Sequence, residues 1–266
     1  MTSENRQHTQ VADALVRAER ERAPMPPLSR SWPGLGLDDA YEIQLYNAAR
    51  RLAAGDERRG HKVGLTSAAM QRQLGVDQPD FGQLFATMEV PDGGQVDLGT
   101  LIAPRVEIEV AFVLSRPLAG PDVDVADVLA VTDHVRPAIE IIDSRIADWQ
   151  IALVDTIADN ASSAGYVLGE PAADHGGAVD ALDLASMTGR LLVNGQEIAA
   201  GTGAEVLGHP AAAVAWLANT LDRRRIALDA GQVVLPGACT RAVPVARGDV
   251  VMASFDGLGD VTVSFR

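Results

Sequence analysis

One segment constrains the fold more than any other part of the chain. Residues 105–114 read RVEIEVAFVL, and their apolar and polar side chains alternate at the period of a half-buried β-strand. Apolar residues at every second position from Val106 to Leu114 share one face, whereas Glu107 and Glu109 share the other. The segment therefore predicts a sheet with a core on one side and two adjacent carboxylates on the other.

The chain is expected to divide near this strand. Before it, apolar residues recur at helical spacing in 8–23 and 38–52. From about residue 95 onwards strand patterns take over. These patterns predict an α+β protein with an N-terminal helical lobe over 1–95 and a strand-rich lobe over 96–266.

Shorter elements are expected within both lobes. Their signals are turn residues, helix caps and changes of hydrophobic period. The expected elements are a strand through Lys62 and Val63, a helix from Ser67 to Gly75, a loop with Pro79 and Gly82, helices over 124–134, 144–158 and 210–222, a strand over 138–143, and a hairpin over 191–198 with an Asn-Gly turn.

The charge balance excludes several classes of partner. Lys and Arg total 22 and Asp and Glu total 36, which gives a formal net charge of −14. An acidic surface disfavours nucleic acid and anionic membranes as partners. No apolar stretch is long enough for a transmembrane helix, and the polar N-terminus lacks the core of a signal peptide. Cys239 is the only cysteine, so no internal disulfide forms, and we expect a cytoplasmic protein.

A third carboxylate accompanies the first two in the sequence pattern. Glu140 interrupts the apolar strand AIEIID at 138–143. If the two strands are neighbours, Glu107, Glu109 and Glu140 converge, and three oxygen ligands suit Mg²⁺ or Mn²⁺. The alternative is a solvated strand face on which these side chains point at water.

Lys62 and Asp80 are candidate catalytic residues. Lys62 stands between Gly60 and Gly64, which allows close approach of a ligand, and Asp80 could move protons. The alternative for Lys62 is an exposed surface lysine. Asp80 could instead be a turn residue beside Pro79.

Two polar loops are candidate walls of a pocket. Ser162 and Ser163 lie in DNASSAG, which could equally end a helix. The loop PGACT offers the backbone of Gly237 and the hydroxyl of Thr240, which could bind a carboxylate, or it could be an ordinary turn. No partner spacing makes Cys239 a nucleophile, so we expect it to be buried or to line the pocket. The sequence contains no GxSxG, strand-linked GxGxxG or GxxxxGK[ST] motif.

Five blocks together resemble the 2-keto-4-pentenoate hydratases, also called 2-hydroxypenta-2,4-dienoate hydratases, of the fumarylacetoacetase-like superfamily. The blocks are GHKVGLTSAAMQRQLGVDQPDFGQLF, RVEIEVAFVL, AIEIIDSRIADWQ, DTIADNASSAGYVLG and PGACT. The resemblance implies a mixed-β fumarylacetoacetase-like fold with a helical N-terminal lobe. It also implies metal-dependent hydration of 2-hydroxypenta-2,4-dienoate to 4-hydroxy-2-oxopentanoate in the meta-cleavage catabolism of aromatic compounds.

The resemblance further assigns roles to residues of this sequence. It implies Mg²⁺ or Mn²⁺ at the three glutamates, with Lys62 and Asp80 beside a small anionic substrate. It implies that Ser162 or Ser163 lines the pocket together with Thr240. Which of the two serines faces the substrate does not follow from the motif.

Other readings of the same motifs remain open. The sister group, the 4-oxalocrotonate (2-oxo-3-hexenedioate) decarboxylases, shares most of them. Hydrolysis of an acylpyruvate C–C bond is less favoured, because no histidine–acid pair accompanies the motifs. A non-catalytic partner subunit is a further alternative, against which the intact candidate residues argue. The family resemblance also suggests a homo-oligomer, which could associate with a related decarboxylase or a downstream aldolase.

Overall fold

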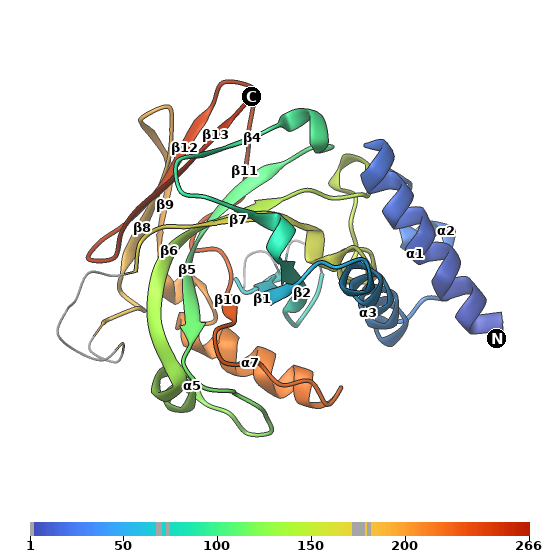
Figure 1. Cartoon of the computed structure of the whole chain (residues 1–266), viewed down its shortest axis with the longest axis horizontal. Coiled ribbons are helices and arrows are strands. Elements are labelled where there is room, and N and C mark those ends of the chain that lie inside the picture. The colour runs from blue at the N-terminus through green and yellow to red at the C-terminus, as the bar shows by residue number, and fades with distance from the viewer. Residues whose placement is uncertain (1–2, 68–70, 73–74, 172–178, 180–181) are drawn as a thin grey trace.

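Two curled sheets and six α-helices form the part of the chain that the computed structural model describes, which is residues 3–67, 71–72, 75–171, 179 and 182–266 (Figure 1). Three helices from the N-terminal region lie together at one end, and the strands of the smaller sheet lie at the other. The helices are α1 (Ser3–Glu21), α2 (Leu28–Ser31), α3 (Leu37–Ala53), α5 (Val125–Val131), α6 (Leu153–Ala158) and α7 (Pro210–Asp222).

The larger sheet has eight strands and carries the candidate site. Its strand order is β2-β1-β10-β5-β6-β7-β3, and β11 also pairs with β5. The strands are β1 (Arg58–Gly64), β2 (Asp80–Phe85), β3 (Glu89–Val90), β5 (Arg105–Leu114), β6 (Thr132–Ile142), β7 (Ser163–Leu168), β10 (Val233–Leu235) and β11 (Val243–Pro244).

The smaller sheet has five strands in the order β4-β13-β12-β8-β9. They are β4 (Gly94–Val96), β8 (Thr188–Val193), β9 (Gln196–Thr202), β12 (Val250–Phe255) and β13 (Gly259–Phe265). Strands β12 and β13 pack against β6 of the larger sheet. Short 3₁₀ turns connect elements at Ala86–Met88, Leu98–Thr100, Ala147–Trp149, Asn160–Ser162 and Gly203–Glu205.

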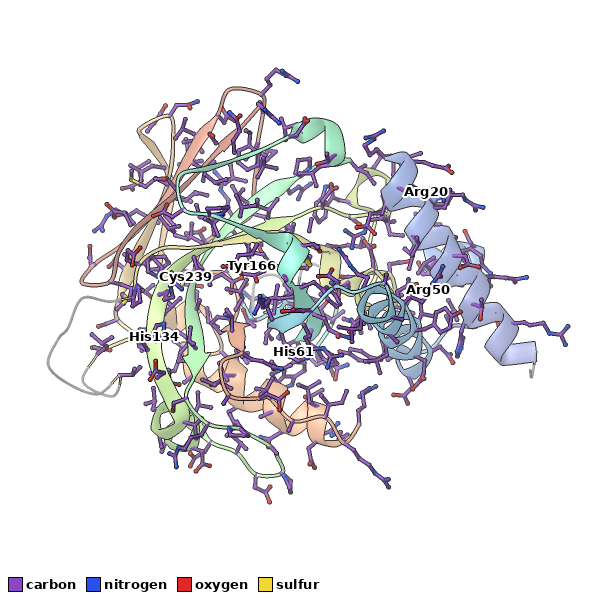
Figure 2. All side chains as sticks on the ribbon, viewed as in Figure 1. Arg20, Arg50, His61, His134, Tyr166 and Cys239 are labelled. Carbon is purple, nitrogen blue, oxygen red and sulfur yellow. The ribbon has the colours of Figure 1, made fainter. Side chains whose placement is uncertain are left out.

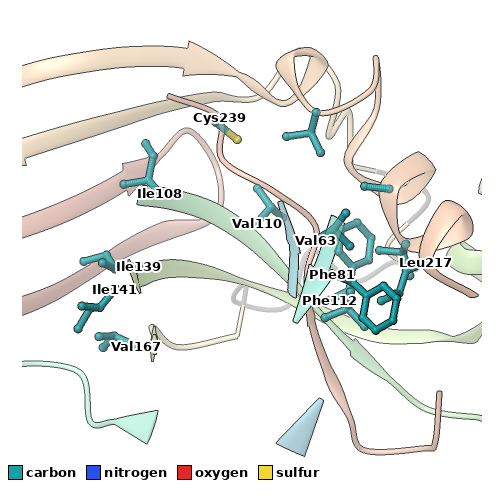
Figure 3. Close-up of a cluster of buried hydrophobic side chains, with 14 of the residues drawn as sticks. Val63, Phe81, Ile108, Val110, Phe112, Ile139, Ile141, Val167, Leu217 and Cys239 are labelled. Atoms are coloured by element: carbon teal, nitrogen blue, oxygen red, sulfur yellow. The ribbon is translucent and has the colours of Figure 1, made fainter. Parts of the chain in front are cut away.

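The core forms on the apolar face that the alternation predicts. Ile108 and Val110 of β5 are buried, as are Ile139 and Ile141 of the neighbouring β6 (Figure 3). Leu217 of α7 belongs to the same buried cluster. Around it, side chains fill the space between helices and strands, with Arg50 on the helical side and His134 on the strand side (Figure 2). This packing fixes β5 and β6, and with them the opposite, polar faces.

Several predicted elements are confirmed. The strand over 105–114 and the helix over 210–222 have the predicted bounds. His209 caps α7, and its Nδ1 accepts a hydrogen bond from the Ala211 N–H. The Asn194-Gly195 turn joins β8 to β9 with positive φ at both residues, as a type I′ turn requires.

Three expectations were wrong in part or too long. The loop expected with Pro79 and Gly82 is present at Pro79, but β2 begins at Asp80 and includes Gly82. Gly82 serves close packing rather than a turn, because a Cβ there would lie 2.3 Å from the Asn160 carbonyl oxygen. The helix expected over 144–158 is a 3₁₀ turn followed by α6, because Asp148 and Trp149 have φ near +55°. The helix expected over 124–134 ends at Val131, where β6 begins.

Two other expectations are not decided. The helix expected from Ser67 to Gly75 includes residues outside the described part of the chain. The division at residue 95 stays a prediction, although β1 and β2 pair within the same sheet as β10 and β5. Among the described residues, no helix combines the length and apolarity needed to cross a membrane.

Candidate active site

Three carboxylates meet on the polar face of the larger sheet. Glu107 and Glu109 lie on β5, and Glu140 lies opposite Glu107 on the antiparallel β6. One carboxylate oxygen from each residue lies within 4.8 Å of the other two. Glu109 and Glu140 are buried, and Glu107 is half-buried. The structure thus brings together the three glutamates that the sequence pattern singles out. None of them lies on a fully solvated face.

Lys62 lies beside this cluster. It is buried on β1, and its Nζ lies 3.2 Å from Oε2 of Glu140. The ammonium also donates to the Ala161 carbonyl oxygen at 3.1 Å. Burial alone would lower the pKa of Lys62, but the surrounding carboxylates, led by Glu140, raise it above its ordinary value. Lys62 is therefore a fixed positive charge in the site rather than a surface lysine.

Asp80 begins β2 on the other side of Lys62. Its Oδ2 accepts a hydrogen bond of 3.0 Å from the Thr156 hydroxyl. Gly64 provides space for this carboxyl group, because a Cβ at that position would lie 2.3 Å from Oδ1 of Asp80. Burial raises the pKa of Asp80, and Lys62 opposes the rise. A buried carboxyl group with a raised pKa is suited to proton transfer near neutral pH.

A left-handed turn holds the Ala161 carbonyl against Lys62. Asn160, Ala161 and Ser162 have φ of 55°, 51° and 55°, and such a conformation costs non-glycine residues roughly 1–2 kcal/mol each. Tertiary hydrogen bonds fix it. The side chain of Asn160 accepts from the Gln83 N–H at 2.8 Å and donates to the Gln83 carbonyl at 2.9 Å.

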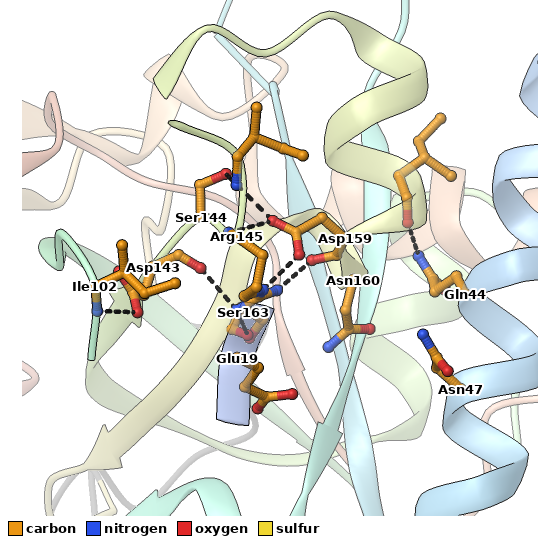
Figure 4. A network of polar contacts seen from close by, with 12 residues as sticks. Glu19, Gln44, Asn47, Ile102, Asp143, Ser144, Arg145, Asp159, Asn160 and Ser163 are labelled. Carbon is orange, nitrogen blue, oxygen red and sulfur yellow. Dashed lines mark hydrogen bonds and ion pairs between the residues drawn. The ribbon is translucent and has the colours of Figure 1, made fainter. Parts of the chain in front are cut away.

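A buried ion pair between Arg145 and Asp159 supports the same turn (Figure 4). The guanidinium of Arg145 contacts a carboxylate oxygen of Asp159 and also donates to the Asp159 carbonyl. Its Nη1 donates to the Asp143 carbonyl at 2.7 Å. The Asp143 N–H in turn donates to the Ser162 carbonyl at 2.8 Å. The turn is thus tied at both of its ends to residues 143–145, which directly follow β6.

The loop 236–240 also reaches the carboxylates. The Gly237 N–H donates to Oε2 of Glu109 at 2.7 Å, and the Cys239 N–H donates to the Ile108 carbonyl at 3.0 Å. Gly201 of β9 packs against this loop so closely that a Cβ on it would lie 2.0 Å from the Cys239 carbonyl oxygen. Burial raises the pKa of the Cys239 thiol to about 12, so this residue is not a thiolate nucleophile.

A cavity of about 570 Å³ opens onto these groups. That volume falls within the usual range of small-molecule sites. Thr240 and Ser162 line it, whereas Ser163 lines a smaller hollow, although its side chain also interacts with Glu140. Further lining residues are Thr66, Arg105, Trp149, Ile151, Thr156, Ile198, Glu205 and Arg241.

The carboxylate cluster fits a divalent cation. Burial raises the pKa of all three glutamates, to about 7 for Glu107, and the charge of Glu140 adds to the rise at Glu107 and Glu109, while Lys62 opposes it. In the described part of the chain, Oε1 of Glu140 has no hydrogen-bond partner, whereas Oε2 lies 3.2 Å from the Lys62 ammonium. Because buried acceptors need a partner and hard cations prefer oxygen ligands, the donor set matches Mg²⁺ or Mn²⁺.

Sequence reasoning missed several groups that shape the site. Thr156, Trp149 and the Ala161 carbonyl carry no local signal, because tertiary contacts alone bring them here. Arg105 could have been found, since it occupies the same strand face as Glu107 at a spacing of two residues.

Comparison with known proteins places the chain in a family. Residues 61–266 match the family model described as fumarylacetoacetate (FAA) hydrolase C-terminal, and the chain belongs to that family. Among named relatives, it is 43% identical to a 2-keto-4-pentenoate hydratase of Paraburkholderia xenovorans, over 98% of this chain and 95% of that one. It is 40% identical to a 4-oxalocrotonate decarboxylase of Pseudomonas sp., over 96% and 95%.

A solved structure agrees with the fold over the full length. The 4-oxalocrotonate decarboxylase of Pseudomonas putida G7, complexed with magnesium and adipate, is 36% identical and matches with a TM-score of 0.94. The match covers 100% of this chain and 99% of that one. The expected fumarylacetoacetase-like fold and family membership are confirmed.

Proposed function

We propose that the protein is a metal-dependent hydratase that converts 2-hydroxypenta-2,4-dienoate and water to 4-hydroxy-2-oxopentanoate. The observation that carries the proposal is that Lys62, Asp80 and Glu107 line one cavity, while Glu109 and Glu140 complete the glutamate cluster within 4.8 Å. Full-length similarity to a 2-keto-4-pentenoate hydratase supports the same reaction. Formation in the meta-cleavage of aromatic compounds would supply this substrate.

Glu107, Glu109 and Glu140 would hold the cation, Mg²⁺ or Mn²⁺. A bound divalent ion supplies Lewis acidity toward the 2-oxo group and the carboxylate of the substrate. The relative solved in complex with magnesium supports a hard divalent cation as the cofactor. The fixed charge of Lys62 beside Glu140 offsets part of the negative charge that the substrate adds.

The reaction needs proton transfers that residues of this chain can perform. The enol hydroxyl loses a proton while C5 gains one, which gives an α,β-unsaturated ketone. Water then adds its oxygen at C4, and C3 gains a proton. We assign the proton transfers to Asp80, with Lys62 holding the local charge. Ser162, Ser163, Gly237 and Thr240 are proposed to bind the substrate, and of these Ser162 and Thr240 line the cavity.

Decarboxylation of 2-oxo-3-hexenedioate is the second candidate. It is favoured by the TM-score of 0.94 to a 4-oxalocrotonate decarboxylase. The same cation and carboxylates would serve either reaction, since both pass through charge at the 2-oxygen. A non-catalytic partner subunit is disfavoured by the intact Lys62, Asp80 and glutamates.

A two-substrate assay separates these functions. Purified protein receives 2-hydroxypenta-2,4-dienoate or 2-oxo-3-hexenedioate, with Mg²⁺, with Mn²⁺, or with EDTA. Ultraviolet loss of the dienoate without release of CO₂ supports the hydratase, whereas CO₂ from the diacid supports the decarboxylase. Inactivity toward both by folded, metal-loaded protein would contradict both and favour the partner subunit.

Assembly and location extend the proposal. We infer a cytoplasmic homo-oligomer that acts on a small anionic substrate. An association with a related decarboxylase or a downstream aldolase would pass on unstable intermediates. Light scattering of the purified protein tests the homo-oligomer.

A further inference from the structure

A half-buried arginine, Arg105, lines the cavity without a salt bridge to any described residue, although its charge acts on the Glu107 carboxylate. Arg105 lies on β5 two residues before Glu107, so its side chain shares the face that carries the carboxylate cluster. Among the described residues, Arg105 forms neither an ion pair nor a side-chain hydrogen bond, unlike the buried Arg145 with its Asp159. The nearest acid on its strand face, Glu107, belongs to the cluster itself.

An aromatic ring fixes this guanidinium in place. The Cζ of Arg105 lies 4.4 Å from the centroid of the Trp149 ring. The indole Nε1 of Trp149 donates to the Ala103 carbonyl at 3.0 Å, which holds the ring. Stacking occupies a face of the guanidinium and leaves the N–H groups at its edges available. Such a preorganised fork matches the two oxygens of a carboxylate.

The position of Arg105 relative to the glutamate cluster sets the distance that a ligand bound to both would have to span. Residues two apart in a strand have Cα atoms roughly 6–7 Å apart. A molecule held at the glutamate cluster by one end would therefore present its other end to Arg105 after a chain of a few carbon atoms.

The cavity has room for such a molecule. Its 570 Å³ equals roughly nineteen times the volume of about 30 Å³ that a water molecule occupies in the liquid. A five-carbon acid and one cation leave part of that volume unfilled. The Arg105 guanidinium is ordered by Trp149, lines this space and has no side-chain hydrogen bond among the described residues, so it is a site for a second anionic group.

We propose that Arg105, stacked on Trp149, binds the far carboxylate of dicarboxylic 2-oxo acids and so determines substrate specificity. The inference rests on the proposed function, because that function places the 2-oxo acid end at the glutamate cluster. It extends the substrate class from the five-carbon monoacid to longer diacids with the same 2-oxo acid end.

Two unreactive ligands of equal chain length test the proposal. 2-Oxoadipate carries a second carboxylate where 2-oxohexanoate carries a methyl group, and both lack the double bonds needed for turnover. Calorimetry with the Mg²⁺-loaded protein should show that 2-oxoadipate binds at least about tenfold more tightly, as expected for charge-assisted hydrogen bonds. In Arg105→Gln the two ligands should bind with about equal affinity, while the affinity for 2-oxohexanoate stays as in the unaltered protein. Arg105→Lys, which keeps the charge but loses the fork, should retain part of the preference.

Arg241→Gln is the matched control. Arg241 also lines the cavity, but it is exposed and donates to the Ile198 carbonyl at 3.3 Å. Removing its charge should leave the preference unchanged. Equal weakening of both ligands in Arg105→Gln would place Arg105 on the shared 2-oxo acid end and overturn the proposal, as would an absent preference in the unaltered protein. Because binding is measured without turnover, failure of the hydratase assay alone would leave this result interpretable.

Discussion

Lys62 is the only lysine in the chain, and the other cationic residues are arginines. Its side chain is 3% exposed and lies between Glu140 and the Ala161 carbonyl. An amine can lose its proton in a suitable environment, whereas a guanidinium does not in proteins. The single side-chain amine therefore lies where its positive charge bears directly on the proposed chemistry.

Replacing Lys62 by alanine should remove activity but not the cation. We expect kcat to fall by roughly a hundredfold or more, the scale of a lost acid–base or charge contribution. Affinity for Mn²⁺ should stay the same or rise, because a positive charge 3.2 Å from a ligand oxygen disappears. Steady-state assays and calorimetry on the same preparation measure the two effects. A parallel loss of cation affinity would instead make Lys62 a structural support of the cluster.

Glu140→Gln should weaken the cation site itself. The substitution keeps the shape of the side chain but removes the charge of a fully buried ligand. Because loss of an outer-shell partner already costs about 10–100-fold in metal affinity, we expect at least a tenfold loss. Calorimetry with Mg²⁺ or Mn²⁺ measures it. Glu205→Gln is the control, since Glu205 lines the cavity outside the cluster, and its affinity should not change.

At the scale of elements, β5 and the left-handed turn show opposite degrees of predictability. The alternation in β5 follows from which face is buried, so its bounds and its carboxylate face are readable from the sequence. That Glu140 lies opposite Glu107 could be expected only conditionally, because register depends on pairing. The turn at Asn160–Ser162 could not be foreseen, since its conformation is imposed by Gln83, Arg145 and the space at Gly82.

Asn160→Ala should loosen this turn. The substitution removes two hydrogen bonds to Gln83 and places alanine at a φ of 55°. We expect the free energy of unfolding to fall by about 1–3 kcal/mol. The kcat should fall as well, because the Ala161 carbonyl no longer fixes Lys62. Denaturant unfolding and steady-state assays measure both, and Asn160→Gly, which tolerates the positive φ, should recover part of the stability. Unchanged kcat in a destabilised variant would confine the turn to a structural role.

At the scale of the whole molecule, the site collects segments that lie far apart along the chain. The cavity draws on Lys62 of β1, Asp80 of β2, Glu107 of β5 and Thr240 of the loop after β10. Motif resemblance could name most of these residues, but their distances depend on sheet order. The gathering of three acids in one largely buried cluster also sets how the stability of the fold responds to pH.

Metal-free protein should lose stability as the pH rises from about 5 to about 8. The pKa of Glu107 is raised from 4.5 to about 7 by burial, so the folded protein keeps a proton that the unfolded chain has released. The unfolded state thus binds fewer protons in this window, and the free energy of unfolding falls as pH increases. Thermal unfolding in EDTA should show a lower Tm at pH 8 than at pH 5.5. Saturating Mg²⁺ should reverse the trend, because the cation binds deprotonated carboxylates.

The contact between Gly201 and the loop 236–240 joins the two sheets through the proposed cation site. The loop touches β9 at the Cys239 carbonyl and holds Glu109 through the Gly237 N–H. A displacement of the smaller sheet would therefore move Glu109, one of the proposed cation ligands. A cation bound to the cluster would in turn resist that displacement. By thermodynamic reciprocity the two events share one coupling free energy. The bound cation would then stabilise the relative position of the two sheets in addition to its role in catalysis.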